Sequence, residues 1–215
     1  MNELIAKLSE ACKAPLPGWN AQKKLINYAR PAPQDVSKVD PDARLGAVLA
    51  LLYPKNGELH TVLMMRNTYQ GAHSNQVSFP GGAYEKVDGT LWHTALREAN
   101  EEIGLPGEKV IKIAELTKVY IPPSRFLVTP FLAFTEKVPH FIPDPYEVKR
   151  IIETPISPFL DQNSILEKNI FIETYKTNLP IKYYNVGGET VWGATAMMLS
   201  EIAEILERSG SEFKL

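Results

Sequence analysis

Three glutamates, Glu98, Glu101 and Glu102, stand three and four residues apart and directly follow Arg97. At roughly 100° per residue, a helix would carry all three on one narrow face. Like charges at this spacing repel one another, so a positive partner is expected on that face. Arg97 stands four residues before Glu101 and could hold that carboxylate, but one guanidinium does not balance three acids. Mg²⁺ and Mn²⁺ prefer carboxylate oxygens and usually keep positions open for water and substrate phosphate, so the spacing predicts a divalent metal site.

The residues around these acids predict an amphipathic helix. Thr90 or Asp88 could cap its start, and Gly104 is the residue type that ends helices in the left-handed conformation. Apolar residues recur at helical spacing and project together on a second face, which is expected to be buried. These apolar residues are Trp92, Leu96, Ala99 and Ile103.

A glycine turn precedes the helix in the stretch Phe79-Pro80-Gly81-Gly82. Glycine lets the backbone pass close to a ligand, and the carbonyl of Gly81 is a natural additional metal ligand. A lone run of acids is most often a solvated helix face. The glycine turn beside the acids favours a metal site instead.

The stretch from Gly82 to Leu105 resembles the Nudix box, whose pattern is Gly-x5-Glu-x7-Arg-Glu-hydrophobic-x-Glu-Glu-x-Gly-hydrophobic. The second half of the pattern, which begins at Arg97, is matched at every specified position, with Ala99 in the first hydrophobic slot. The first half departs from the pattern. Asp88 stands where the pattern has its first glutamate, and eight residues rather than seven separate it from Arg97.

This resemblance implies an α/β fold of the Nudix type, an α/β/α sandwich with a central mixed β-sheet, and hydrolysis of a pyrophosphate bond. It also implies that Glu98 and Glu102, helped by Glu101 and the carbonyl of Gly81, bind one to three Mg²⁺ or Mn²⁺ ions. Arg97 is expected to orient Glu101 rather than to act on the substrate.

Further candidate residues lie outside the metal set. A general base is expected, and its location varies among Nudix enzymes, so Glu102 and Glu147 are both candidates. Arg66 could pair with a substrate phosphate or cap a strand. His73 stands just before the glycine turn, where it could touch a nucleotide or be solvated. The candidate substrate-binding residues are Arg66, His73, Gln76 and Gly82.

Other stretches resemble the coenzyme A pyrophosphatase branch of the family. They are the spacing from Arg66 to the glycine turn, the proline segment at 154–157 and the sequence Trp-Gly-Ala-Thr-Ala at 192–196. The branch's motif before the glycine turn is only partly present, because four of its positions differ. Met64 replaces a threonine, Asn67 a serine or alanine, Gly71 an arginine and Asn75 a glycine. The missing arginine would have been a natural partner for phosphate or adenine.

The first hypothesis is therefore metal-dependent hydrolysis of coenzyme A or its derivatives to 3′,5′-ADP and 4′-phosphopantetheine. A Nudix pyrophosphatase acting on another nucleoside diphosphate derivative, such as NADH or ADP-ribose, is the enzymatic alternative. A non-catalytic nucleotide-sensing domain is a third hypothesis, which the intact set of box acids disfavours.

Composition argues against several kinds of partner. The formal charge of −2 over 215 residues gives no basic stripe for nucleic acid. No apolar run approaches the roughly 18 residues that span a bilayer, so no membrane partner is expected. Cys12 is the only cysteine, which excludes intramolecular disulfides and favours a cytoplasmic protein.

The chain is expected to divide into residues 1–42, an N-terminal helix and an irregular proline-containing arm, and residues 43–215, the Nudix domain. The arm could wrap on the domain or form a homodimer. Strands are expected at 44–53, 59–66, 77–79, 109–116, 126–134, 147–153, 170–175 and 181–185, and a closing helix at 195–208. Strands interrupted by a central and a terminal helix indicate a layered α/β fold with a mixed sheet.

Overall fold

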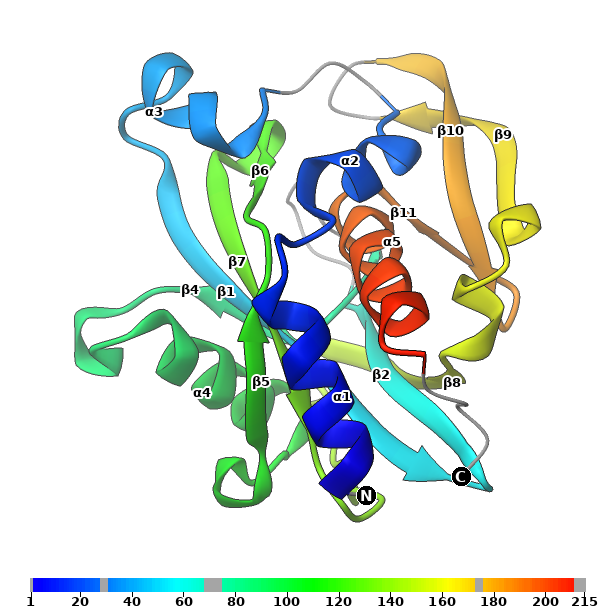
Figure 1. Ribbon diagram of the computed structural model, residues 1–215. Helices are drawn as coiled ribbons and strands as arrows, with labels where there is room; N and C mark the ends of the chain where they lie inside the picture. Colours follow the sequence, from blue (N-terminus) through cyan, green and yellow to red (C-terminus); the bar gives the residue numbers. More distant parts are fainter. Residues whose placement is uncertain (1, 28–30, 68–74, 173–175, 211–215) are drawn as a thin grey trace.

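The computed structural model describes residues 2–27, 31–67, 75–172 and 176–210 (Figure 1). Within these residues, eight strands form a mixed sheet. Its centre is β1, which pairs in parallel with β7 and antiparallel with β2 and β4. The strands are β1 (Arg44–Lys55), β2 (Glu58–Arg66), β3 (Val77–Ser78), β4 (Gly81–Ala83), β5 (Ile111–Glu115), β6 (Val119–Ile121), β7 (Phe126–Phe134) and β8 (Val148–Pro155).

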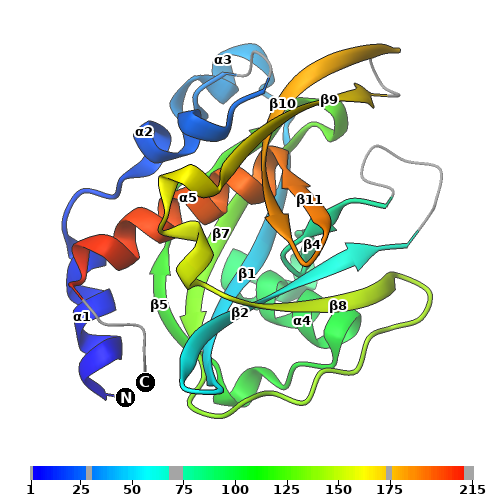
Figure 2. The same ribbon diagram turned by 90° about the vertical axis from the view of Figure 1, so that its right-hand side faces the viewer.

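Helices cover both faces of this sheet, so the predicted α/β/α arrangement is confirmed. Helix α4 (Leu91–Ile103) packs its apolar side on one face through Ala95 and Ala99, against Leu49 and Leu51 of β1. On the opposite face lie α5 (Gly193–Arg208) and α1 (Asn2–Lys13), and Figure 2 shows α1 near the C-terminal end of α5, with the two helices at a steep angle to each other. β1 reads as one continuous apolar run because helices bury both of its faces.

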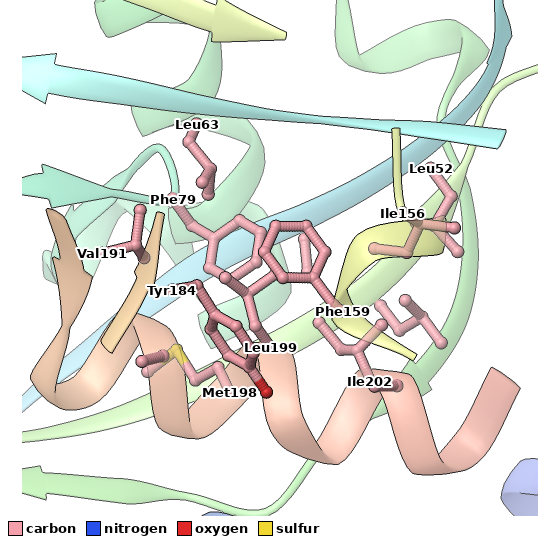
Figure 3. Close-up of a cluster of buried hydrophobic side chains, with 14 of the residues drawn as sticks. Leu52, Leu63, Phe79, Ile156, Phe159, Tyr184, Val191, Met198, Leu199 and Ile202 are labelled. Carbon is pink, nitrogen blue, oxygen red and sulfur yellow. The ribbon is translucent and has the colours of Figure 1, made fainter. Parts of the chain in front are cut away.

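A buried cluster ties the start of the glycine turn to α5. Figure 3 shows Phe79, Phe159 and Tyr184 converging above Leu199 of α5. The rings of Phe159 and Tyr184 meet edge to face, with their centroids 5.1 Å apart. Phe79 is only 1 % exposed, so the chain enters the turn from a fixed position.

A second antiparallel sheet follows the first, in the order β11-β10-β9. It contains β9 (Ile165–Ile172), β10 (Thr177–Val186) and β11 (Glu189–Trp192). The predicted late strand pair is confirmed, although both strands are longer than expected and residues 173–175 lie outside the described residues. The three-residue strand β6 and the strand β11 were not predicted, because such short strands carry too few residues to show an alternating pattern.

The N-terminal segment contains short helices, so the prediction of an irregular arm over 14–42 is wrong for much of it. The helices are α2 (Gly18–Gln22) and α3 (Val36–Val39), with 3₁₀ turns at Lys23–Leu25 and Pro33–Asp35. The physical reason is that proline suits the first turn of a helix, and here Pro17 and Pro33 start short helices rather than interrupt structure.

This N-terminal segment shares the core of the rest of the chain. Leu8 and Leu25 are fully buried in the cluster that contains α5. Gln22 donates from Nε2 to the Glu201 carboxylate of α5 over 2.8 Å, and the Ser200 hydroxyl of α5 donates to the carbonyl of Ala21. A division between residues 42 and 43 stays a prediction, but the two sides of it pack as one body around α5.

Further 3₁₀ turns complete the described chain, at Lys86–Asp88, Gly107–Lys109, Pro122–Ser124, Ser157–Phe159 and Gln162–Ser164. In the part of the chain that the structure describes, none of the helices has both the length and the apolar character that crossing a bilayer requires.

Candidate active site

Helix α4 has fixed ends, which set the positions of the acids along it. The Thr90 hydroxyl accepts the His93 backbone N–H over 3.2 Å, so Thr90 rather than Asp88 caps the helix. Gly104 ends it in the left-handed conformation, with φ 68° and ψ 23°, as predicted.

Arg97 uses all five of its N–H donors within the protein. Nε and Nη2 donate to the two oxygens of Asp88 over 2.7 and 3.1 Å, and Nη2 also donates to the carbonyl of Ala83. Nη1 donates to both Glu98 and Glu101 over 2.9 Å. The predicted orientation of Glu101 by Arg97 is therefore seen, and Glu98 is oriented in the same way.

Asp88 is the buried anchor of this arginine. Its side chain is 2 % exposed, and the hydrogen bonds from Arg97 hold the pKa of its carboxyl far below the usual range. The Thr94 hydroxyl donates to the same carboxylate over 2.8 Å. Asp88 thus meets Arg97 despite the longer loop and shorter side chain that separate this sequence from the Nudix pattern.

The two glycines allow close approaches that no other residue permits. Gly81 has φ +151°, and a Cβ there would lie 2.2 Å from the carbonyl oxygen of Ala47 on β1. A Cβ on Gly82 would lie 2.4 Å from the carboxylate carbon of Glu98. The glycine turn is therefore pressed between β1 and the acids of α4.

Glu102 is buried rather than solvated, with an exposed fraction of 1 %. Arg66 donates from Nη1 to its Oε1 over 3.0 Å, and the Gly81 backbone N–H donates to its Oε2 over 2.8 Å. Burial raises the pKa of Glu102 to about 8, and the charges of Glu98 and Glu147 add to the effect. Glu102 is therefore the buried member of the acid cluster, and each of its carboxylate oxygens accepts a hydrogen bond.

Glu147 belongs to the same cluster although it comes from another element. It is exposed, in the turn immediately before β8. The strand was predicted to begin at residue 147, and β8 begins one residue later, at Val148. Its charge raises the pKa of both Glu98 and Glu102, in each case after the larger effect of desolvation. The fold therefore brings Glu147 to the acids of α4.

Comparison with known proteins decides the family. A family profile described as "NUDIX domain" matches residues 43–152, which include the glycine turn, α4 and Glu147. The chain belongs to the Nudix family. As a Nudix hydrolase, it is an enzyme that acts on pyrophosphate bonds, and Nudix hydrolases generally need divalent metal ions.

Several curated Nudix proteins resemble this chain. "Uncharacterized Nudix hydrolase NudL" of Pectobacterium atrosepticum is 31 % identical over 146 residues, covering 66 % of this chain and 72 % of that protein. "Nudix hydrolase 15, mitochondrial" of Arabidopsis thaliana is 32 % identical over 178 residues, covering 77 % of this chain and 61 % of that protein. "Peroxisomal coenzyme A diphosphatase NUDT7" of Mus musculus is 32 % identical over 124 residues, covering 58 % of this chain and 52 % of that protein.

The predicted metal ligands of this Nudix site are not arranged around a metal position here. Among the described residues, no group of three or more His, Cys, Asp or Glu side chains lies in an arrangement that could hold an ion. The reason is that two arginines hold the acids: Arg97 binds Glu98 and Glu101, and Arg66 binds Glu102. Each of these contacts engages one oxygen of its carboxylate, so the remaining lone pairs would have to converge for these side chains to bind one ion together.

The chemistry of the donor set nevertheless fits a hard dication. Glu98, Glu101, Glu102 and Glu147 gather with less positive charge than would balance them, because Arg97 is also committed to buried Asp88 and Ala83. Carboxylate oxygens are the ligands that Mg²⁺ and Mn²⁺ prefer. Desolvation raises the pKa of Glu98 and Glu102, and a nearby dication would offset that cost of burying their charge.

The predicted substrate-binding residues have different positions around this site. Arg66 pairs with Glu102 over 3.0 Å, and its contact with a substrate phosphate stays a prediction. The Gln76 carbonyl accepts the Arg66 backbone N–H over 3.0 Å, directly before β3. His73 lies outside the described residues. Gly82 lies against Glu98, at the inner side of the cluster.

The Trp-Gly-Ala-Thr-Ala stretch packs at the start of α5. The Thr195 hydroxyl donates to the carbonyl of Val77 over 3.0 Å, which ties α5 to β3 just before the glycine turn. Sequence reasoning missed the anchoring role of Asp88, although an acid near the first glutamate position of the box was the signal for it.

Proposed function

We propose that this Nudix hydrolase cleaves the pyrophosphate bond of coenzyme A or its derivatives, using Mg²⁺ or Mn²⁺, to give 3′,5′-ADP and 4′-phosphopantetheine. The acid cluster of Glu98, Glu101, Glu102 and Glu147 beside the glycine turn supports the chemistry. The observation that carries the choice of substrate is the 32 % identity to the mouse protein named coenzyme A diphosphatase. The Trp-Gly-Ala-Thr-Ala stretch and the spacing from Arg66 to the glycine turn support the same branch of the family.

In this proposal the residues have separate roles. Glu98, Glu101 and Glu102, together with the carbonyl of Gly81, would hold the metal. Such a dication would supply positive charge for the phosphoryl oxygens and for activating water. Arg97 keeps Glu98 and Glu101 at their places on α4 through the hydrogen bonds of its Nη1.

Glu147 is the better general base of the two candidates. Its side chain is open to solvent, whereas both oxygens of Glu102 already accept hydrogen bonds. Its charge acts on Glu98 and Glu102, which is consistent with a position beside the reacting groups. Glu147 would accept the proton of the water that attacks phosphorus.

A substrate panel tests the proposal directly. The whole protein is incubated with Mg²⁺ or Mn²⁺ and with coenzyme A, acyl-coenzyme A, NADH or ADP-ribose, and the products are separated by chromatography. Faster hydrolysis of coenzyme A than of NADH and ADP-ribose is expected. A rate on ADP-ribose well above the rate on coenzyme A would reject the choice of substrate.

Two matched variants separate an enzyme from a nucleotide sensor. The side chain of Glu101 is about half exposed and pairs with Arg97 at the surface of α4, so Glu101→Gln should fold normally. An enzyme should then lose about 10²-fold or more in kcat, whereas a sensor should keep its ligand response. Glu108→Gln, an exposed acid just past the end of α4, is the control and should leave turnover unchanged. No loss of turnover in Glu101→Gln would reject the role of Glu101.

A cytoplasmic location and a homodimer formed through residues 1–42 remain proposals. The mass of the whole protein in solution tests the second one. The Gln22 and Ala21 contacts with α5 occupy the inner side of this segment, so a dimer would have to use its outer side.

A further inference from the structure

The turn before β8 is fastened to the carboxyl end of α4. The backbone N–H of Ile142 donates to the carbonyl of Ile103 over 2.9 Å, and the N–H of Asp144 donates to the carbonyl of Glu102 over 2.9 Å. The last carbonyls of a helix have no partner within the helix, and this segment supplies two donors for them. The hydrogen bond to the carbonyl of Glu102 therefore holds the turn close to Glu102.

The next residues of the turn are held from the other side by Asn67. Its Nδ2 donates to the carbonyls of Pro145 and Tyr146 over 2.8 and 3.1 Å. The backbone N–H of Asn67 donates to the carbonyl of Glu147 over 2.8 Å. The Asp144 carboxylate accepts the Tyr146 N–H over 2.7 Å. Four hydrogen bonds therefore fix the backbone on which the Tyr146 side chain stands.

The Tyr146 side chain itself is open to solvent. It is 88 % exposed, the largest value among the exposed large apolar residues that the structure describes. An aromatic ring held on a fixed backbone loses little further freedom when it binds a flat partner. It immediately precedes Glu147, so a partner on the ring would lie beside the acid cluster.

Lys149 stands on the other side of Glu147 and differs from the arginines nearby. Arg66, Arg97 and Arg150 each pair with a carboxylate. The ammonium of Lys149 contacts the neutral Asn75 side chain over 3.3 Å, and among the described residues no carboxylate pairs with it. A cation without an acidic partner, two residues along the chain from Glu147, is a natural anion contact.

We propose that Tyr146 stacks on the base of the nucleotide substrate and that Lys149 pairs with a phosphate carried on its ribose. This rests on the proposed function, because the adenosine of coenzyme A carries such a phosphate at its 3′ position. The acid cluster receives the pyrophosphate, and the turn beside it receives the nucleoside. Lys149 is then the residue that distinguishes a 3′-phosphorylated nucleotide from other nucleoside diphosphate derivatives, and Tyr146 binds the base that these compounds share.

Calorimetry with product nucleotides tests both residues. The probes are 3′,5′-ADP and 5′-AMP, added to the whole protein with Mg²⁺ at constant ionic strength. Tyr146→Ala should weaken both nucleotides about tenfold, since base stacking on an aromatic side chain is lost. Tyr146→Phe keeps the aromatic face and should restore the binding. If Tyr146→Ala binds both nucleotides as tightly as the wild type does, the stacking assignment is overturned. This holds also if the substitution changes the mass of the protein in solution and leaves nucleotide affinity unchanged.

The Lys149 assignment has its own signature. Lys149→Met should weaken 3′,5′-ADP about tenfold, as expected for loss of a charged hydrogen bond, and should leave 5′-AMP within twofold of the wild-type affinity. The same variant should raise KM for coenzyme A and not for dephospho-coenzyme A. Equal weakening of both nucleotides, or of neither, would overturn this assignment.

Two controls and one comparison complete the design. Phe171→Ala removes another exposed aromatic ring, on β9 of the second sheet, and Lys137→Ala removes another exposed lysine; both should bind nucleotides as the wild type does. If the wild type hydrolyses ADP-ribose and not coenzyme A, the proposed function fails. The Tyr146→Ala comparison with 5′-AMP still decides the stacking assignment in that case.

Discussion

Replacing Gly82 with alanine is expected to reduce catalysis much more than stability. The φ of Gly82 lies outside the left-handed region, so alanine can adopt its backbone conformation. The added Cβ would lie 2.4 Å from both Cδ and Oε2 of Glu98, and 2.5 Å from Oε1. Ordinary contacts of a Cβ fall between 3.4 and 4 Å, so the carboxylate must retreat by about 1 Å.

A displacement of that size in a metal-binding carboxylate is worth about 10²-fold in rate. The Cβ would meet the carboxylate at the far end of the flexible Glu98 side chain. Movement of this carboxylate can relieve the clash, so the fold should survive. We expect kcat of Gly82→Ala to fall by about 10²-fold and the metal concentration at half-maximal rate to rise. The assay is initial rate on coenzyme A against metal concentration, with the thermal midpoint measured in parallel.

Gly107→Ala is the matched control for this substitution. Its Cβ would meet only Leu96, at 3.5 Å, which is ordinary contact, and it lies away from the acid cluster. Gly107→Ala should keep wild-type turnover and metal dependence. If Gly82→Ala retains kcat within twofold of the wild type with unchanged metal dependence, the placement of Glu98 against Gly82 does not serve catalysis and the reasoning is refuted.

Three further predictions concern ion pairs and buried acids. Arg97→Ala leaves Asp88 buried without its partner and should lower the free energy of unfolding by about 3 kcal/mol in urea titrations; a change below about 0.5 kcal/mol would contradict this. The hydrogen bond from Arg125 lowers the pKa of Asp40 to about 2, below the value of about 3.9 in unfolded chains. The ionised Asp40 carboxylate therefore stabilises the fold fully above pH 4, and this stabilisation is lost as the pH falls from 4 to 2. In Arg125→Met, the free energy of unfolding should depend less on pH over this range, as measured by acid unfolding followed by circular dichroism. Glu201→Ala removes the acceptor of several N–H groups and should cost about 2 kcal/mol, with faster hydrogen exchange in residues 17–25 than in wild type; unchanged exchange there would contradict it.

Local sequence signals predicted the elements that carry the acids. Helix α4 could be predicted because its apolar period, its Thr90 cap and its Gly104 stop all agree. The glycine turn could be predicted because two adjacent glycines favour a tight turn or a close approach of the backbone. The need for Gly82 opposite Glu98 could not, since it depends on how closely β4 approaches α4.

The partners of the acids could not be predicted, because they come from distant parts of the chain. Arg66 and Glu102 are separated by 36 positions and meet only when β2 and α4 pack on each other. The same holds for Glu147, which reaches the cluster through the pairing of β8 with β2. Periodicity describes which face of an element a residue occupies and says nothing about the residue that it will face.

The covering of α5 by the N-terminal segment affects how the enzyme can be produced. Twelve of the sixteen residues of α5 are buried, including the polar Ser200 and Glu201. A recombinant form that starts at the Nudix boundary, residue 43, would lack Leu8 and Leu25, and would present that apolar side of the helix to water. Such a form is expected to aggregate during expression, so crystallisation and enzymology should use protein that retains the first 42 residues.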